Sequence, residues 1–214
     1  MLAVETYGVT KLHRGKAVVN DFSFALEAGE TCAIKGNTSS GKSTLLMMLA
    51  GLLSPSSGSI QLFGTNIAGS YPQMNKYVGF VPQRVCLPMH MSVEGILQYS
   101  AWLHKINKDA VRTKMFHLMD LLDLYPQDRV THLNEESRKK LSLAAAVIHA
   151  PDLILVDDIT MVFSQKELIQ VITLLSEEQK RGAAVLAASR GTDGIAKFCH
   201  KTVPIHKIGV GEHS

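Results

Sequence analysis

Short apolar runs alternate with longer amphipathic stretches along most of this chain. The runs are typical of strands, and those at 153–156 and 183–188 are wholly apolar, as expected for strands buried on both faces of a parallel sheet. In the longer stretches apolar residues recur at i, i+3 and i+4, the spacing of an amphipathic helix. The predicted strands are 18–26, 30–35, 58–63, 77–81, 153–156 and 183–188. The predicted helices are 43–53, 93–106, 110–124, 135–149 and 165–180.

This order of elements predicts an α/β fold in which helices cover a mostly parallel sheet. From about residue 84 to 150 the pattern is helical only, which indicates a helical insert in the middle of the chain. We expect a single domain over 1–214, with a core formed by 1–83 and 151–208 and a helical subdomain at 84–150.

Composition narrows the class of protein. The chain has 214 residues, of which 46% are hydrophobic and 19% charged, enough for a sizeable core. Its net charge of +3 comes from scattered basic residues, so we expect no nucleic-acid partner. The three cysteines, Cys32, Cys86 and Cys199, are odd in number and widely spaced, so reduced thiols are expected. No signal peptide is recognised, and no apolar run reaches the roughly 20 residues that span a bilayer, so any membrane role is expected to depend on a partner.

A glycine-rich segment between a predicted strand and a predicted helix carries the clearest chemistry. It has the GxxxxGK[ST] spacing of a Walker A loop, in which backbone N–H groups surround the phosphates of ATP at a helix N-terminus. Lys42 would reach the β- and γ-phosphates, and the Ser43 hydroxyl would ligate Mg²⁺. The alternative, a chance glycine-rich turn, is disfavoured by the strand before and the helix after. The expected ATP-binding residues are Gly36, Asn37, Thr38, Ser39, Ser40, Gly41, Lys42, Ser43 and Thr44.

A carboxylate follows the apolar run 153–156. A strand ending here would place Asp157 near Ser43, where it would hold Mg²⁺ through water. The alternative for Asp157 alone is an aspartate that caps a loop.

With these motifs the chain resembles the ATP-binding subunits of ABC transporters over essentially its whole length, most closely those of ABC-2-type exporters. The segment 36–44 is similar to their Walker A, 153–158 to their Walker B and 133–151 to their signature region. Val81-Pro82-Gln83 is similar to their Q-loop, which implies that Gln83 contacts Mg²⁺ and senses the γ-phosphate. The segment 88–93, followed by Tyr99, carries the weaker similarity to exporters.

The resemblance implies a P-loop NTPase fold with an N-terminal antiparallel β subdomain. It also implies that two such domains, identical or different, close head to tail around two ATP molecules. A transmembrane transporter subunit would be held by the helical insert and the Q-loop. The expected location is cytoplasmic, at the inner face of the cell membrane.

The signature region departs from the family pattern. The family sequence Leu-Ser-Gly-Gly-Gln is here Leu133-Asn134-Glu135-Glu136-Ser137. Glu135 and Glu136 would face a triphosphate with like charge, at a cost on the order of several kcal/mol at about 4 Å. The alternative is an ordinary helix start, because Asn134 is a good N-cap and glutamates favour the first turn.

Three further family positions also differ. The catalytic glutamate is replaced by Asp158, one methylene shorter, which is either a weak base or a second polar residue at the strand end. The switch histidine is replaced by Arg190, which cannot accept a proton but can bind a γ-phosphate or form a surface salt bridge. The segment 160–164 lacks an aspartate that couples the two sites in the family.

His13 occupies the nearest match to the family's adenine-stacking aromatic residue, and a plain surface histidine is the alternative. Taken together, these departures predict ATP binding with weak or lost hydrolysis. The favoured function is an ATP-binding subunit that couples ATP to export through a transmembrane partner. The alternative is a soluble regulatory or scaffolding protein that uses the same fold without transport.

Overall fold

Two sheets and a set of helices form the protein in the computed structural model, which describes residues 1–67, 74–158, 163–189 and 194–205. An antiparallel sheet has the strand order β2-β1-β4-β5, and a parallel sheet has the order β6-β7-β8-β3-β9. The antiparallel strands are β1 (Leu2–His13), β2 (Lys16–Glu27), β4 (Ser57–Leu62) and β5 (Thr65–Asn66). The parallel strands are β3 (Thr31–Lys35), β6 (Val78–Val81), β7 (Leu153–Val156), β8 (Ala184–Ser189) and β9 (Lys201–Pro204).

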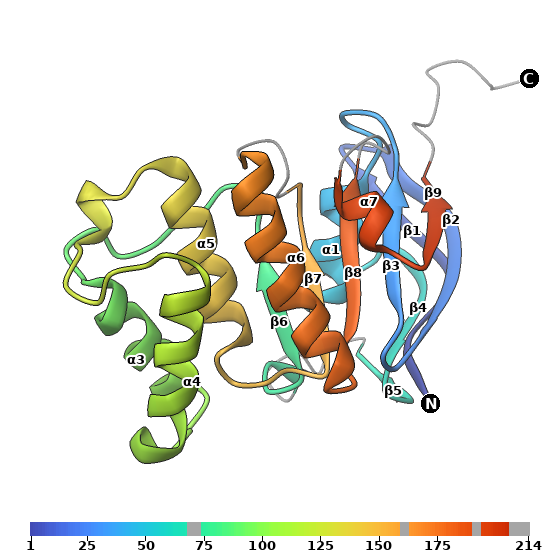
Figure 1. The fold of residues 1–214 in the computed structure, drawn as a ribbon. Coiled ribbons are helices and arrows are strands. Elements are labelled where there is room, and N and C mark those ends of the chain that lie inside the picture. The colour runs from blue at the N-terminus through green and yellow to red at the C-terminus, as the bar shows by residue number, and fades with distance from the viewer. Residues whose placement is uncertain (68–73, 159–162, 190–193, 206–214) are drawn as a thin grey trace, which may run out of the picture.

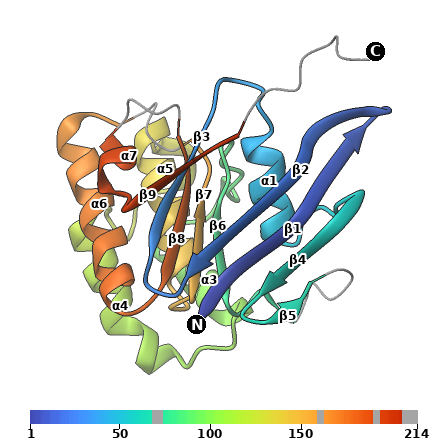
Figure 2. The same cartoon turned by 90° about the vertical axis from the view of Figure 1, so that its right-hand side faces the viewer.

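The helices divide between the faces of the parallel sheet and a separate bundle (Figure 1). Helix α1 lies between the two sheets, while α6 covers the other face of the parallel sheet, α5 packs against β6 at its edge, and α3 and α4 lie beyond α5 (Figures 1 and 2). The helices are α1 (Lys42–Leu49), α3 (Val93–Leu103), α4 (Lys108–Leu121), α5 (Glu135–Val147), α6 (Gln165–Lys180) and α7 (Gly194–Phe198), with a short 3₁₀ helix at Val130–His132.

Strand β7 shows why its sequence is apolar throughout. Leu153 and Leu155 pack into the core around α1 between the two sheets. Ile154 and Val156 point to the opposite face and join the core formed with α5 and α6. Because successive strand side chains alternate between faces, a strand covered on both sides must be apolar at every position.

The α/β fold with a parallel sheet, an antiparallel β subdomain and a helical insert is therefore confirmed. The chain pattern did not reveal β1, because bulges between Leu2 and Leu12 repeatedly shift its register and break the alternation. It also missed β9, which is short, half-exposed and at the sheet edge. Among the described residues, no helix has both the length and the apolar character needed to cross a bilayer.

Candidate nucleotide-binding site

The loop between β3 and α1 is shaped by two glycines. A Cβ atom on Gly36 would lie 2.4 Å from Ser40 Oγ and 2.6 Å from the Ile205 carbonyl oxygen. Gly41 has φ +94°, and a Cβ atom there would lie 2.4 Å from the Val18 carbonyl oxygen. Neither position can carry a side chain without moving backbone, so close packing of the loop explains both glycines.

The start of α1 suits an anion. Gly41 occupies the N-cap, no side chain of the described residues caps the helix, and its first turn holds no acidic residue. The first N–H groups of α1 and the positive end of the helix dipole therefore meet at this loop. Lys42 is buried, and its Nζ donates to the carbonyl oxygens of Gly36 at 2.6 Å and Asn37 at 2.8 Å. The ammonium group thus lies over the loop, within reach of phosphates placed in it.

A buried carboxylate lies beside this loop. Asp157 follows β7, is 3% exposed, and accepts a hydrogen bond from the Ser43 side chain. Burial raises the pKa of Asp157, and the Ser43 hydrogen bond and the nearby lysines oppose that shift. Its Oδ1 has no hydrogen-bond partner among the described residues. A buried carboxylate oxygen without a donor, next to a hydroxyl group, fits the oxygen ligands that Mg²⁺ prefers.

The Q-loop residue meets the strand end at the same place. Gln83 Nε2 donates to Asp158 Oδ2 at 3.3 Å. Asp158 is 9% exposed and has φ 43°, a left-handed conformation that aspartate adopts more readily than most residues. The structure thus brings Ser43, Gln83, Asp157 and Asp158 together from three separate segments. The sequence had placed Asp157 near Ser43, whereas it had not indicated the contact between Gln83 and Asp158. Their roles toward Mg²⁺ and water remain predictions.

Sequence reasoning missed Lys139. This residue lies on α5, is 3% exposed, and its Nζ donates to the carbonyl oxygens of Pro82 at 2.7 Å and Gln83 at 2.5 Å. Burial lowers the pKa of Lys139, while the charges of Asp157 and Asp158 oppose that shift. The sequence signal was a lysine pair inside a helix rich in alanine and leucine, since an enclosed lysine needs acceptors.

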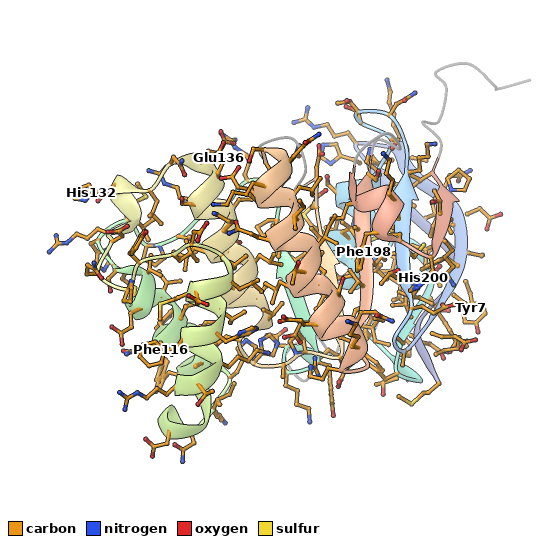
Figure 3. The ribbon with its side chains drawn as sticks, viewed as in Figure 1. Tyr7, Phe116, His132, Glu136, Phe198 and His200 are labelled. Carbon is orange, nitrogen blue, oxygen red and sulfur yellow. The ribbon has the colours of Figure 1, made fainter. Side chains whose placement is uncertain are left out.

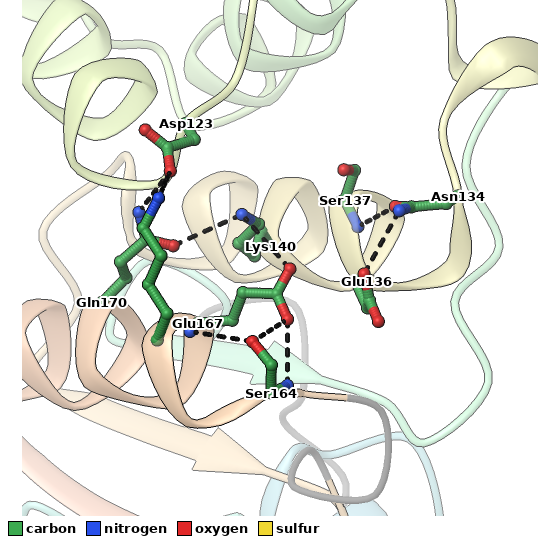
Figure 4. A network of polar contacts seen from close by, with 9 residues as sticks. Asp123, Asn134, Glu136, Ser137, Lys140, Ser164, Glu167 and Gln170 are labelled. Carbon is green, nitrogen blue, oxygen red and sulfur yellow. Dashed lines mark hydrogen bonds and ion pairs between the residues drawn. The ribbon is translucent and has the colours of Figure 1, made fainter.

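The signature segment is held by its own side chains. Asn134 Oδ1 accepts a hydrogen bond from the Ser137 N–H at 2.8 Å, and Asn134 Nδ2 donates to Glu136 Oε2 at 3.2 Å (Figure 4). Glu135 and Glu136 fill the first turn of α5. Figure 3 shows Glu136 and His132 at the same rim of the helical bundle. The predicted N-cap at Asn134 is therefore confirmed.

The remaining predicted positions are Arg190, the segment 160–164 and His13. Arg190 and the positions 160–162 lie outside the described residues. His13 is exposed at the end of β1, opposite Lys16 in the hairpin whose second strand brings Val18 against Gly41. A contact between His13 and adenine stays a prediction.

A glycine-rich loop between β3 and the N-terminus of α1, with a carboxylate at the end of β7 in the same parallel sheet, defines a P-loop nucleotide-binding domain. The family model for ABC transporters matches residues 19–161, more than half of the chain. The chain therefore belongs to the ABC transporter family.

Curated relatives agree with this placement. The chain is 28% identical over 203 residues to Nod factor export ATP-binding protein I of Rhizobium leguminosarum bv. viciae, covering 94% of this chain and 65% of the relative. It is 29% identical to the ABC transporter ATP-binding protein NatA of Bacillus subtilis, covering 88% of this chain and 78% of the relative. Several of the curated relatives that the chain matches are longer, and the chain spans less than two thirds of their length.

Solved structures share the fold. An ATP-binding subunit of an ABC transporter superposes with a TM-score of 0.89 at 19% identity, covering 96% of this chain and 86% of that one. A dimeric ATP-binding cassette bound to ADP and Pi in a post-hydrolysis state gives a TM-score of 0.83 at 19% identity, covering 94% of each chain. At these identities the likeness establishes the fold alone.

Proposed function

We propose that this chain binds Mg²⁺–ATP at residues 36–44 and acts as the ATP-binding subunit of an ABC transporter that works in export. The observation that carries this proposal is the uncapped N-terminus of α1 beside the buried Asp157 carboxylate. The helix N-terminus attracts an anion, and the Asp157 carboxylate attracts a hard cation. Mg²⁺–ATP supplies both. Curated relatives named as ATP-binding proteins for export support the same function.

Each group has a distinct part in binding. The loop N–H groups would surround the phosphates, and Lys42 would exchange the Gly36 and Asn37 carbonyl oxygens for phosphate oxygens. Ser43, Gln83 and Asp157 would hold the metal ion. When bound, Mg²⁺ neutralises phosphate charge. None of these contacts needs the signature segment, so binding is expected even where that segment has lost its function.

Hydrolysis is proposed to be weak or lost. Asp158, at the position of the family's catalytic glutamate, is one methylene shorter and lies at hydrogen-bond distance from the Gln83 side chain. A general base must reach its water directly, and a misplacement of about 1 Å can cost about 10²-fold in rate. Arg190 at the switch position offers a cation and no proton acceptor. In this proposal ATP holds a conformation, and a partner domain supplies most of the turnover.

The second ATP-binding domain is the first proposed partner. In a head-to-tail pair the start of α5 would face the other domain's nucleotide, where Glu135 and Glu136 would repel phosphate. A self-pair would contain this repulsion twice, and a mixed pair only once. The repulsion therefore favours a different partner domain. Sedimentation of the chain alone, and mixed with a candidate partner domain, distinguishes the self-pair from the mixed pair.

A groove offers a place for the transmembrane partner. It has a volume of about 810 Å³ and runs between the end of α1, the edge strand β6 and the end of α3. Leu52 and Leu103 line it and are 65% and 54% exposed, so the groove offers two large apolar side chains to a partner. We propose that a cytoplasmic segment of a membrane-embedded subunit packs here and holds this chain at the inner face of the membrane.

Nucleotide titrations test the proposal directly. The affinities for ATP and ADP with Mg²⁺, and the release of phosphate, are measured on the chain and on Lys42→Ala. Binding that is about 10- to 100-fold weaker in Lys42→Ala, with little phosphate release from either, is the expected result. Turnover at an ordinary transporter rate that depends on Lys42 would overturn the hydrolysis part. Binding without any recruitment to a membrane subunit would favour the scaffolding alternative.

A further inference from the structure

Lys139 joins two segments that belong to different parts of the site. It lies on α5 five residues beyond Asn134, where the signature segment begins the helix. Its ammonium group donates to the carbonyl oxygens of Pro82 and Gln83, 57 and 56 residues earlier in the chain. One buried side chain on α5 therefore holds the backbone on which the Gln83 side chain is carried.

The contact continues to the end of β7. From the backbone held by Lys139, the Gln83 side chain reaches Asp158 Oδ2 at 3.3 Å. The carboxylates of Asp157 and Asp158 lie near enough to act on the Lys139 charge. Lys139 on α5, the Q-loop and Asp158 thus form one continuous series of hydrogen bonds that passes through Gln83.

The next residue provides an internal comparison. Lys140 is 4% exposed, about as buried as Lys139, but its Nζ lies 3.4 Å from Gln170 Oε1 and 3.9 Å from Glu167 Oε1 on α6 (Figure 4). Adjacent helix positions point about 100° apart, so the two lysines reach different neighbours from the same turn. Removing Lys140 therefore removes a buried charge from α5 without touching the Q-loop.

We propose that Lys139 is a positioning residue that fixes Gln83 relative to Asp158 and so links the start of α5 to the metal side of the nucleotide site. The nucleotide part of this inference rests on the proposed function. In a head-to-tail pair, the start of α5 would meet one nucleotide and Gln83 the other. Lys139 would then connect the two sites within one chain, in which 160–164 lacks the family's coupling aspartate.

The position of the Q-loop can be followed through a native thiol. Cys86 is exposed three residues after Gln83, whereas Cys32 is buried and its pKa is raised to about 11 by burial, which keeps it unreactive. In a Cys199→Ser background, maleimide labelling near pH 7 therefore reports on Cys86. Labelling rates are compared for Lys139→Met, Lys139→Arg and Lys140→Met without nucleotide.

Lys139→Met is expected to label Cys86 at least about fivefold faster, because it removes both hydrogen bonds that hold the loop and the loss of one alone corresponds to about that factor. Lys139→Arg keeps donor groups and is expected near the parent rate, as is Lys140→Met. If Lys139→Met does not fold, Lys139→Leu, which also lacks a donor, replaces it. A parent labelling rate in the folded variant, or an equal rise in Lys140→Met, would overturn the inference.

ATP affinity with Mg²⁺ and with EDTA separates positioning from general damage. Lys139→Met is expected to weaken ATP binding about fivefold in Mg²⁺ and to leave binding in EDTA within about twofold, because Gln83 faces the metal side. An equal loss in both conditions would assign Lys139 a purely structural role. If the parent chain binds no ATP, the proposed function fails, and the Cys86 labelling still decides whether Lys139 positions the loop.

Discussion

Helices α1 and α5 begin with opposite chemistry, although both present a helix N-terminus. Helix α1 starts at Gly41 with no capping side chain among the described residues, while α5 starts at Asn134, whose side chain accepts from the Ser137 N–H. Two glutamates occupy the first turn of α5 and none that of α1. The start of α1 therefore favours an external anion, whereas the Ser137 N–H group at the start of α5 already has an acceptor within the chain.

The difference teaches that a helix dipole alone does not make a phosphate site. Both helices carry the same positive end, and only the residues at the start decide whether phosphate or the chain's own oxygen atoms occupy it. In the family pattern the starts of both helices contact ATP, and the two helix starts at one ATP molecule come from different domains. Here the α5 start has the features of an ordinary capped helix, and the four experiments that follow test how far the contrast extends.

The largest expected effect comes from removing the Lys42 ammonium group at the start of α1. Lys42→Ala should weaken ATP binding about 10- to 100-fold, because a charge-assisted hydrogen bond to phosphate is lost. Calorimetric titration with Mg²⁺–ATP measures this. Lys180→Ala, which removes an exposed lysine in the last turn of α6, is the control and should bind as the parent does. Equal loss in both variants would argue against a specific role for Lys42.

Neutralising the α5 start should make it more like the α1 start. Glu135→Gln combined with Glu136→Gln removes the like charge opposite phosphate and should tighten ATP-dependent association about tenfold. Sedimentation in Mg²⁺–ATP and in Mg²⁺–ADP, for the chain alone and mixed with a candidate partner domain, gives the measurement. Glu27→Gln, at the end of β2, serves as the control. Unchanged association would mean that these carboxylates do not face a nucleotide.

Removing the α5 cap should reduce stability and leave nucleotide binding intact. Asn134→Ala should cost about 1 kcal/mol of unfolding free energy, because the Ser137 N–H loses its acceptor. Asn134→Asp should restore most of that loss. Denaturant unfolding gives the free energy, and ATP affinity is measured alongside. A drop in ATP affinity within a single chain would show that the two helix starts are not independent.

The smallest effect concerns the far end of α5. His149 stacks on His104 with ring centroids 3.6 Å apart, and burial lowers the pKa of His149 to about 4. The unfolded chain then binds a proton between pH 6.5 and 4 that the folded chain does not, so stability falls as pH falls through this range. His149→Leu should remove about 0.5–1 kcal/mol of that fall, since partial exposure weakens the full effect.

The measurement for this last prediction is unfolding by denaturant at several pH values from 7 to 4 for both chains. His90→Leu, a change at an exposed histidine, is the control and should leave the pH dependence as it is. A fall in stability that is the same with and without His149 would show that other groups cause it.

Much of the candidate site was readable from local sequence. Gly36, Gly41, Lys42 and Ser43 fall within eight consecutive residues, and Asp157 directly follows an apolar run, so spacing alone indicated their roles. The Asn134 cap was predicted for the same reason, because a cap acts on a backbone group only three residues away.

Lys139 could not be found in this way, since its acceptors lie 56 and 57 residues earlier in the chain. Which of two adjacent lysines faces the Q-loop depends on how α5 is rotated against β6. Rotation is set by packing of the whole helical bundle, which no local pattern encodes.

The sequence by itself determined the α/β class, the phosphate loop and the acidic start of α5, because periodicity, glycine geometry and capping act over a few residues. The tertiary structure alone decided that Gln83 meets Asp158, that the Asp157 carboxylate is buried, and that Lys139 holds the Q-loop. These contacts join segments far apart in the chain, and their geometry exists only once both faces of the parallel sheet are covered.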